Sequence, residues 1–360
     1  MKALILAGGF GTRLRPLSCT RPKILFPIVN QPLLTWSFEK LANSNIDEAI
    51  LAVDRQTEIF VKQQRIRKCG LHVAYSRDPL RKPLGTGGPI RKAEKLLGHD
   101  DPFLVLNGDI FADVNYREIL KVHENKKAVA TIALHEVIDP SRYGVAKLTK
   151  EDQIKRFIEK PPREQAPTNL INAGVYVLSP EIFKHIPKER KVSLEHEVFP
   201  ELAKTRELYG YVFNGLWMDI GKMEDYLKIN RVLLDSLSTP QMIRSEVKVR
   251  RPVALDEEVS VGEESVIGPY AVLGRDVTVG SSVHIRNSVI FPGTTVSDSS
   301  SINGAIIGEN AAIGRNVRIG EGCVLGDRVE VKDDVSLVSG VTICPAKEVS
   351  ESVLTPKHII

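Results

Sequence analysis

The residues of this chain best suited to bind a phosphate lie close to its N-terminus. The apolar run Ala3–Ala7 leads directly into three glycines and three cations, which are Gly8, Gly9, Gly11, Arg13, Arg15 and Lys23. A glycine turn after a buried strand brings backbone N–H groups close to a ligand, because glycine has no Cβ and tolerates positive φ. With fixed cations just downstream, the expected ligand is a polyphosphate.

A tight turn with solvated arginines is the alternative, and neither the Walker A loop nor the G-x-G-x-x-G pattern matches. The run Gly8–Leu17 with the pair Pro22-Lys23 resembles nucleotide-sugar pyrophosphorylases, also called sugar-1-phosphate nucleotidylyltransferases, although Ser18 stands where threonine is usual. The resemblance implies that Arg13 and Lys23 take the charge of the leaving pyrophosphate. It also implies a set of nucleotide-binding residues, which are Leu6, Ala7, Gly8, Gly9, Gly11 and Thr12.

Two aspartates are candidate metal ligands. Asp109 ends the run Val105–Asp109, and Asp219 lies in Trp217–Gly221. Each alone could be an ordinary turn aspartate. Ligands of open α/β sheets bind at the carboxyl ends of the strands, and Mg²⁺ prefers oxygen ligands. The resemblance implies that Asp109 and Asp219 are the catalytic metal ligands and that the cofactor is Mg²⁺.

Three further segments resemble the sugar-binding part of the same family. Glu159 and Lys160 match its Glu-Lys-Pro motif, Asn172 its sugar-binding turn, and Gly144 a segment that leaves room for the sugar ring. The resemblance implies that Glu159 and Asn172 contact sugar hydroxyls and that Lys160 contacts the sugar 1-phosphate. Without the motif, Glu159 and Lys160 would be interpreted as an exposed charge pair.

A second glycine-rich loop, Pro83–Pro89, opens a predicted helix. Its Thr86 could simply cap that helix. The loop, with Gly85 and Thr86 as nucleotide contacts, resembles the form found in guanylyltransferases of the family. The implied reaction joins GTP and mannose 1-phosphate to give GDP-mannose and pyrophosphate. Glucose 1-phosphate with dTTP or UTP is the alternative substrate pair, and a non-catalytic subunit that binds the sugar nucleotide is the alternative function.

The elements that must position these residues form two predicted domains, 1–238 and 239–360. The first alternates strands and helices, as in Lys2–Leu6, Leu33–Ser44, Glu48–Val53, Glu58–Lys68, Leu71–Tyr75, Gly88–Leu97, Phe103–Leu106 and Met223–Ser236. Further strands are expected at Ala128–Glu136, Gly144–Leu148 and Gly174–Leu178. This alternation predicts a Rossmann-like α/β nucleotidyltransferase domain with a mixed, mainly parallel sheet.

Beyond about residue 239 the apolar residues recur every six positions. The first series is Val261, Ile267, Leu273, Val279, Ile285 and Phe291, and the second runs from Ile307 to Ile343. This period predicts a left-handed parallel β-helix of hexapeptide repeats. Phe291 and Ile307 are sixteen residues apart, so a loop or insertion is expected between them. Some such β-helices are acyltransferases, but His284 is the only histidine within the repeats.

Composition excludes several other classes of protein. The 360 residues carry a net charge of +4, without a basic run interleaved with aromatics, so nucleic-acid binding is not expected. The four cysteines lie far apart, which favours free thiols over a zinc site or disulfides. No apolar stretch is long enough to cross a membrane. We therefore expect a cytoplasmic protein that associates into a homo-oligomer through the flank of its β-helix.

Overall fold

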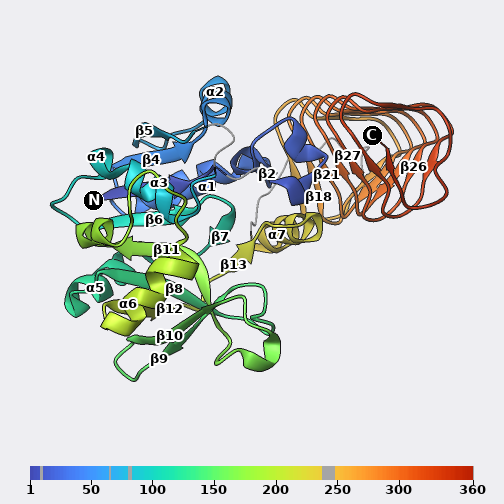
Figure 1. Ribbon diagram of the computed structural model, residues 1–360. Helices are drawn as coiled ribbons and strands as arrows, with labels where there is room; N and C mark the ends of the chain where they lie inside the picture. The colour runs from blue at the N-terminus through green and yellow to red at the C-terminus, as the bar shows by residue number, and fades with distance from the viewer. Residues whose placement is uncertain (9–10, 65, 80–82, 237–247, 360) are drawn as a thin grey trace. The chain divides into compact units, whose positions relative to one another are not determined.

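The computed structural model describes residues 1–8, 11–64, 66–79, 83–236 and 248–359 (Figure 1). They belong to two compact units, one comprising Met1–Gly9 and Leu33–Asp219, the other Phe10–Pro32 and Ile220–Ile360. Gly9 and the predicted domain boundary at 238/239 lie outside the described residues. Among the residues that are described, no helix is long and apolar enough to span a membrane.

A nine-stranded mixed sheet forms the core of the first unit. Its strands are β1 (Lys2–Leu6), β4 (Glu48–Val53), β5 (His72–Arg77), β6 (Phe103–Asn107), β8 (Ala130–Glu136), β9 (Gly144–Leu148), β10 (Ile154–Glu159), β11 (Leu170–Leu178) and β12 (Leu208–Val212). The order is β10-β9-β11-β6-β1-β4-β5, and β8 and β12 branch from β11. Strands β6, β1, β4 and β5 are parallel, whereas β11 is antiparallel to its neighbours. The predicted mixed α/β sheet is confirmed.

Helices of the same unit connect and cover these strands (Figure 1). They are α1 (Leu33–Asn43), α2 (Arg55–Gln63), α3 (Gly87–Lys92), α4 (Glu94–Leu97), α5 (Tyr116–Lys126) and α6 (Phe199–Thr205), with a π-helix at Leu194–Val198 and 3-10 turns at Arg163–Gln165 and Pro180–Lys184. Helix α2 begins before the predicted Glu58, because Asp54 caps it by accepting from the Thr57 N–H at 2.7 Å. The predicted helix Gly88–Leu97 is two short helices that meet at Ala93.

Two short strands form a separate antiparallel ribbon in this unit. They are β7 (Ile110–Ala112) and β13 (Trp217–Asp219), and Asp219 pairs with Ile110. The sequence pattern did not predict this pairing, because the two strands have only three residues each and stand more than a hundred positions apart.

The second unit contains the N-terminal signature segment and the β-helix. The segment Phe10–Pro32 holds 3-10 turns at Thr12–Leu14, Leu17–Cys19 and Lys23–Leu25 and a small ribbon of β2 (Pro27–Ile28) and β3 (Gln31–Pro32). The predicted helix Met223–Ser236 is present as α7 with the same bounds. Within this unit the dark-blue segment lies beside α7 and the first orange coils (Figure 1).

Three parallel sheets form the sides of the β-helix, in agreement with the predicted left-handed hexapeptide fold. The first contains β14 (Lys248–Val249), β17 (Val266–Ile267), β20 (His284–Arg286), β23 (Ser301–Asn303), β26 (Arg318–Ile319) and β29 (Ser336–Leu337). The second contains β15 (Val253–Leu255), β18 (Ala271–Leu273), β21 (Val289–Ile290), β24 (Ile306–Ile307), β27 (Val324–Leu325), β30 (Thr342–Ile343) and β32 (His358–Ile359). The third contains β16 (Ser260–Val261), β19 (Thr278–Val279), β22 (Thr295–Val296), β25 (Ala312–Ile313), β28 (Glu330–Val331) and β31 (Glu348–Val349).

The expected interruption between Phe291 and Ile307 is wrong. Leu273 pairs with Ile290, and Ile290 pairs with Ile307, so the stack continues without an insertion. The aliphatic residue of that coil is Ile290, not Phe291. The steps from Ile285 to Ile290 and from Ile302 to Ile307 are five residues instead of six, and two corners shortened by one residue each account for the break in the period.

Candidate functional site

The first part of the site lies where β1 and β6 end. Leu6 pairs with Asn107 in the parallel register, and the Gly108 N–H donates to the Leu6 carbonyl at 2.8 Å. On the other side, the Ala7 N–H donates to the Ala52 carbonyl at 3.0 Å. The predicted nucleotide ligands at Leu6–Gly8 and the predicted metal ligand Asp109 therefore share one edge of the sheet, at the carboxyl ends of parallel strands, where ligands of such sheets bind.

The ribbon of β7 and β13 brings the two predicted metal aspartates together. Asp109 directly precedes β7, and Asp219 pairs with the first residue of that strand, Ile110. Both aspartates are half-buried. Among the described residues, no group of three or more histidine, cysteine or acidic side chains could hold a metal. Two carboxylates nevertheless suit Mg²⁺, which commonly takes one or two from the protein and its remaining ligands from phosphates and water.

Asp78 lies beside the predicted phosphate-binding turn, at a position that the sequence reasoning missed. It directly follows β5, and its N–H donates to the Val53 carbonyl at 2.8 Å. A Cβ on Gly8 would lie 3.2 Å from Oδ2 of Asp78, so this carboxylate borders the phosphate-binding turn. Its Oδ1 is buried and has no hydrogen-bond partner among the residues that the structure describes, and burial raises the pKa of Asp78 to about 6. Nothing in the dipeptide Asp78-Pro79 signalled this position, because its proximity to Gly8 arises only from strand order.

Glu159 is the most constrained of the predicted sugar-binding residues. It ends β10 and pairs with Gly144 on β9. A Cβ on Gly144 would lie 2.7 Å from Oε2 of Glu159 and 2.5 Å from Phe157, so only glycine leaves space for this carboxylate. Oε1 is 3.2 Å from Nζ of Lys160, whereas Oε2 is buried and has no partner within the described part of the chain. Burial raises the pKa of Glu159, and the charge of Lys160 opposes that shift. The carboxylate therefore carries a buried acceptor that the described residues leave unsatisfied.

Asn172 is buried, and its amide is bonded inside the protein. Its Oδ1 accepts from the Gly174 N–H at 2.9 Å, and its Nδ2 donates to the Tyr176 hydroxyl at 3.0 Å. These bonds span the irregularity between Asn172 and Tyr176 in the pairing of β11 with β8. Asn172 thus shapes the turn, and its contact with a sugar stays a prediction.

The predicted base-binding loop is joined to the segment before α6. Gly85 has a φ of +74°, and a Cβ there would lie 2.2 Å from the Val192 carbonyl. The Thr86 hydroxyl donates to Oε2 of Glu195 at 2.6 Å and accepts from the Leu194 N–H at 2.9 Å. Thr86 occupies the N-cap position of α3, as the alternative interpretation expected, but its side chain makes no capping hydrogen bond and instead bonds the segment around Glu195.

Glu195 is a second residue that the sequence reasoning missed. Its charge raises the pKa of Glu159, so the two carboxylates belong to one electrostatic environment. It lies in the π-helix Leu194–Val198, and π-helical turns often occur at functional sites.

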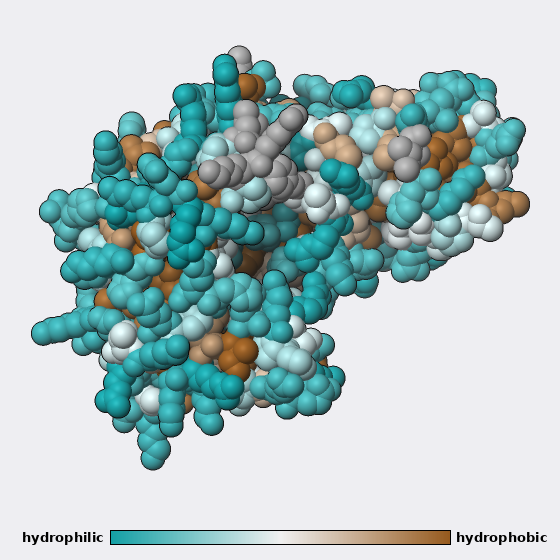
Figure 2. Space-filling view, viewed as in Figure 1, coloured by the Kyte–Doolittle hydropathy of each residue, from teal (hydrophilic) through white to brown (hydrophobic). Residues whose placement is uncertain are grey.

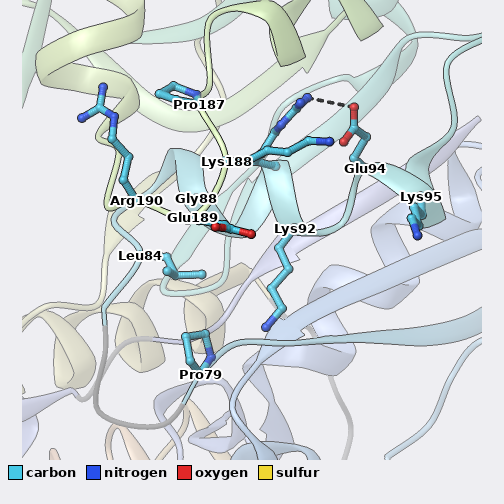
Figure 3. A pocket seen from close by; sticks show the side chains of 11 residues that line it. Pro79, Leu84, Gly88, Lys92, Glu94, Lys95, Pro187, Lys188, Glu189 and Arg190 are labelled. Atoms are coloured by element: carbon cyan, nitrogen blue, oxygen red, sulfur yellow. Dashed lines mark hydrogen bonds and ion pairs between the residues drawn. The ribbon is translucent and has the colours of Figure 1, made fainter.

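A cavity of about 600 Å³ lies beside the base-binding loop. Its walls combine Pro79, Leu84, Gly88 and Pro187 with the charged residues Arg91, Lys92, Glu94, Lys95, Lys188, Glu189 and Arg190 (Figure 3). Lys92 extends toward Pro79 in this view. Five cations against two carboxylates make the cavity positive, which favours anions. Hydrophilic side chains also dominate the visible face of the molecule (Figure 2).

Trp217 connects the aspartate ribbon with the predicted sugar-binding segment. Its indole N–H donates to the Ala173 carbonyl at 3.0 Å, and its ring meets Tyr143 edge-on at 5.1 Å. Tyr143 in turn accepts from the Lys160 N–H at 3.0 Å through its carbonyl. One half-buried aromatic side chain therefore links the residues near Asp219 to those near Lys160.

The remaining predicted residues belong to the second unit. Gly11 has a φ of 55° and begins the turn Thr12–Leu14, and its carbonyl accepts from the Ser18 hydroxyl at 2.7 Å. Thr12 and Arg13 are exposed. Lys23, by contrast, is 9% exposed and opens the turn Lys23–Leu25. Of the two predicted pyrophosphate ligands, Arg13 is therefore exposed and Lys23 is buried.

Comparison with protein families matches both parts of the chain. Residues 2–236 match the family described as "Nucleotidyl transferase", and residues 249–359 match the "GMPPB C-terminal domain". The chain is 36% identical to the mannose-1-phosphate guanylyltransferase catalytic subunit beta of Dictyostelium discoideum over 71% of each chain. It is 40% identical to the mannose-1-phosphate guanyltransferase of Yarrowia lipolytica over 66% of this chain and 65% of that one. The chain thus spans slightly less than two thirds of the Yarrowia protein.

Solved structures agree with the sequence comparison. A UDP-glucose pyrophosphorylase complexed with UDP-glucose matches with a TM-score of 0.57 at 25% identity, covering 66% of this chain and 99% of that chain. The resemblance inferred from the sequence motifs is confirmed. The chain belongs to the nucleotidyl transferase family.

Proposed function

We propose that this protein joins GTP and mannose 1-phosphate to give GDP-mannose and pyrophosphate. The observation that carries the proposal is the assembly of Asp109, Asp219, Glu159 and the loop at Thr86 in one unit of a nucleotidyl transferase fold. Relatives named as mannose-1-phosphate guanylyltransferases support the choice of sugar and base. We assign transfer to residues 1–238 and assembly to residues 239–360.

An oxygen of the sugar 1-phosphate attacks the α-phosphorus of GTP, and the bond to the β-phosphate breaks as pyrophosphate leaves. The attacking oxygen is already anionic, so the reaction needs no general base. Catalysis then consists of positioning and charge neutralisation. Arg13 and Lys23, with the amides of Gly8–Thr12, take the charge of the pyrophosphate, and Lys160 binds the phosphate of the sugar.

The divalent cation in this proposal is Mg²⁺, held by Asp109 and Asp219. When bound, Mg²⁺ neutralises phosphate charge and helps to orient the phosphates. The pairing of Asp219 with Ile110, next to Asp109, supports the assignment of both aspartates to one ion. The protein's own contribution is the fixed separation of the two carboxylates, which the ribbon sets.

Glu159 selects the sugar in this proposal. Its partnerless Oε2 accepts a hydrogen bond from a ring hydroxyl, while Lys160 occupies Oε1. Gly144 keeps the space that this carboxylate needs. Asn172 acts by holding the turn at Gly174, next to the same part of the site.

Asp78 supports guanine as the base. The carboxylate borders Gly8 and has a free Oδ1. Guanine presents two adjacent donors, N1–H and the 2-amino group, to a carboxylate. Uracil and thymine present one N–H flanked by two carbonyl oxygens, which a carboxylate repels. A buried acceptor of this kind discriminates strongly against a base that leaves it unpaired.

A grid of substrates tests the proposal. Pyrophosphate release is measured for GTP, UTP and dTTP, each with mannose 1-phosphate and with glucose 1-phosphate. We expect the highest kcat/KM for GTP with mannose 1-phosphate. Highest activity with UTP or dTTP would overturn the assignment of the base, and binding of GDP-mannose without any release would favour a regulatory subunit.

We also propose that the protein is a homo-oligomer that assembles through its β-helix. Leu354, near the C-terminal end of this β-helix, is 71% exposed, and exposed apolar residues at a repeat end favour association. Light scattering after gel filtration measures the mass. A single species of one chain mass at all concentrations would contradict this proposal.

A further inference from the structure

The signature segment Phe10–Pro32 is held against the β-helix by a buried arginine. Arg21 is 7% exposed, and its Nη2 donates to Oδ2 of Asp327 at 2.7 Å and to Oε2 of Glu309. Its guanidinium lies 5.0 Å above the ring of Phe291. Thus three residues of the β-helix surround one side chain of the segment.

Asp327 makes one contact that recurs between coils of the β-helix and a second contact that is specific to the signature segment. Its Oδ1 accepts from the Glu309 N–H at 2.8 Å, across successive coils. Asp333 makes the same kind of bond elsewhere, accepting from the Arg315 N–H at 2.7 Å. Only the second oxygen of Asp327 is directed to the segment, where it accepts from Arg21 and, at 2.6 Å, from the Thr20 hydroxyl.

Residues that follow Lys23 in the sequence are attached as well. Phe26 meets Tyr226 and Phe291 edge-on, at 5.8 and 6.4 Å. The Val29 N–H donates to Oδ1 of Asn230 at 2.8 Å. Lys23 thus lies between two attachment points, Arg21 on one side and Phe26 on the other, and its own side chain is buried.

The ion pairs of Arg21 with Asp327 and Glu309 restrict where the signature segment can lie. A charged side chain is expensive to bury unless it is paired, and Arg21 is paired with both carboxylates through its Nη2. The two carboxylates occupy the same place in successive coils, Ile307-Gly308-Glu309 and Leu325-Gly326-Asp327. The β-helix therefore fixes the backbone of the segment immediately before Lys23.

We propose that Arg21 is a positioning residue, and that its ion pairs with Asp327 and Glu309 hold Lys23 where it binds the leaving pyrophosphate. This inference rests on the proposed function of that cation. The β-helix then contributes directly to turnover, in addition to any role in assembly.

The test compares full-length Arg21→Lys and Asp327→Asn with Asp333→Asn as the matched control. Asp333→Asn changes an equivalent repeat contact that does not involve the segment. Direct binding of pyrophosphate is measured by calorimetry, and KM values are measured in the reverse reaction, in which pyrophosphate cleaves GDP-mannose. We expect pyrophosphate affinity to fall about 10²-fold in the first two variants, because small displacements of a binding group cost this much. The KM for GDP-mannose should stay unchanged, which a general loss of structure would not produce.

Circular dichroism and thermal unfolding identify any variant that does not fold. Glu309→Gln then takes its place, because Glu309 is 36% exposed and its change is milder. Pyrophosphate binding equal to that of Asp333→Asn in folded variants would overturn the inference. A wild-type protein without turnover would contradict the proposed function instead, and the binding measurement would still decide the role of Arg21.

Discussion

Asp219 lies opposite Ile110 in the β7–β13 ribbon, one position from Asp109. Two aspartates separated by more than a hundred residues in the chain are therefore close along the backbone of the fold. The antiparallel register of two three-residue strands brings them together.

Removing either charge should abolish most turnover. Asp109→Asn and Asp219→Asn are each expected to lower kcat by about 10²–10³-fold, because each removes one charge that holds the phosphates through the cation. Steady-state pyrophosphate release at saturating Mg²⁺ measures the effect. Asp113→Asn, on an exposed aspartate that directly follows β7 and pairs with Lys40, is the control and should retain activity. Full activity in either of the first two variants would remove that residue from the metal site.

Asp78→Asn should weaken the preference for guanine. An asparagine offers one acceptor and one donor, which suits uracil better than a carboxylate does. We expect the ratio of kcat/KM for GTP to that for UTP to fall about 10–100-fold, the discrimination of one bidentate pair. An unchanged ratio in a folded variant would show that other residues recognise the base.

The same carboxylate predicts a pH dependence of base preference. The pKa of Asp78 is raised to about 6, so the group is ionised above that pH and protonated below it. The ratio of kcat/KM for GTP to that for UTP should therefore decline as pH falls through about 6. Titration of the triphosphates cancels in the ratio. Asp78→Asn should give a flat profile, and an equally sloping profile in this variant would contradict the assignment.

Gly144→Ala should impair sugar binding without changing nucleotide binding. The new Cβ would approach Oε2 of Glu159 to 2.7 Å and the ring of Phe157 to 2.5 Å, so the carboxylate must move. We expect the KM for mannose 1-phosphate to rise about 10²-fold and the KM for GTP to stay the same. Glu159→Gln should share this selectivity. Equal effects on both KM values would indicate general distortion of the site.

His123 should make the transferase unit sensitive to mild acid. Its ring is buried between the Thr131 and Ser179 hydroxyls, each 2.9 Å away, and burial lowers its pKa from 6.5 to about 4. The unfolded chain therefore binds the proton first. The free energy of unfolding has its full value above pH 6.5. It should fall by about 2 kcal/mol between pH 6.5 and pH 5, because the unfolded chain takes up a proton at His123 that the folded chain does not.

Denaturant unfolding of wild type and His123→Gln over this pH range isolates the contribution. The difference in free energy of unfolding between the two proteins should change by about 2 kcal/mol between pH 6.5 and pH 5. His99→Gln, at a side chain that is 65% exposed, should keep the wild-type slope. Parallel slopes for wild type and His123→Gln would show that the histidine does not titrate as described.

Local patterns predicted the elements of this fold better than their contacts. Three elements have the predicted bounds, namely the strands Lys2–Leu6 and Glu48–Val53 and the helix Met223–Ser236. Their apolar residues form a buried run or recur with the helical period, and both patterns can be recognised in a sequence. The six-residue period likewise predicted the β-helix. It was misinterpreted only where the steps from Ile285 to Ile290 and from Ile302 to Ile307 take five residues, because a shortened corner breaks the six-residue period as an insertion would.

The contacts of the site depended on strand order, which the sequence does not display. Asp78 borders Gly8 and Glu195 bonds Thr86 only because distant segments fold side by side. Neither lies in a motif that the sequence reasoning had linked to the site. The attachment of Arg21 to Asp327, three hundred residues later, is the extreme case.

Transfer of labelled phosphate tests the central claim most directly. The wild-type protein is incubated with Mg²⁺, mannose 1-phosphate and GTP labelled at its α-phosphorus. The label should appear in GDP-mannose, in amounts equal to the pyrophosphate released. Label recovered only as GDP or GMP, or left in GTP, would contradict the proposed nucleotidyl transfer.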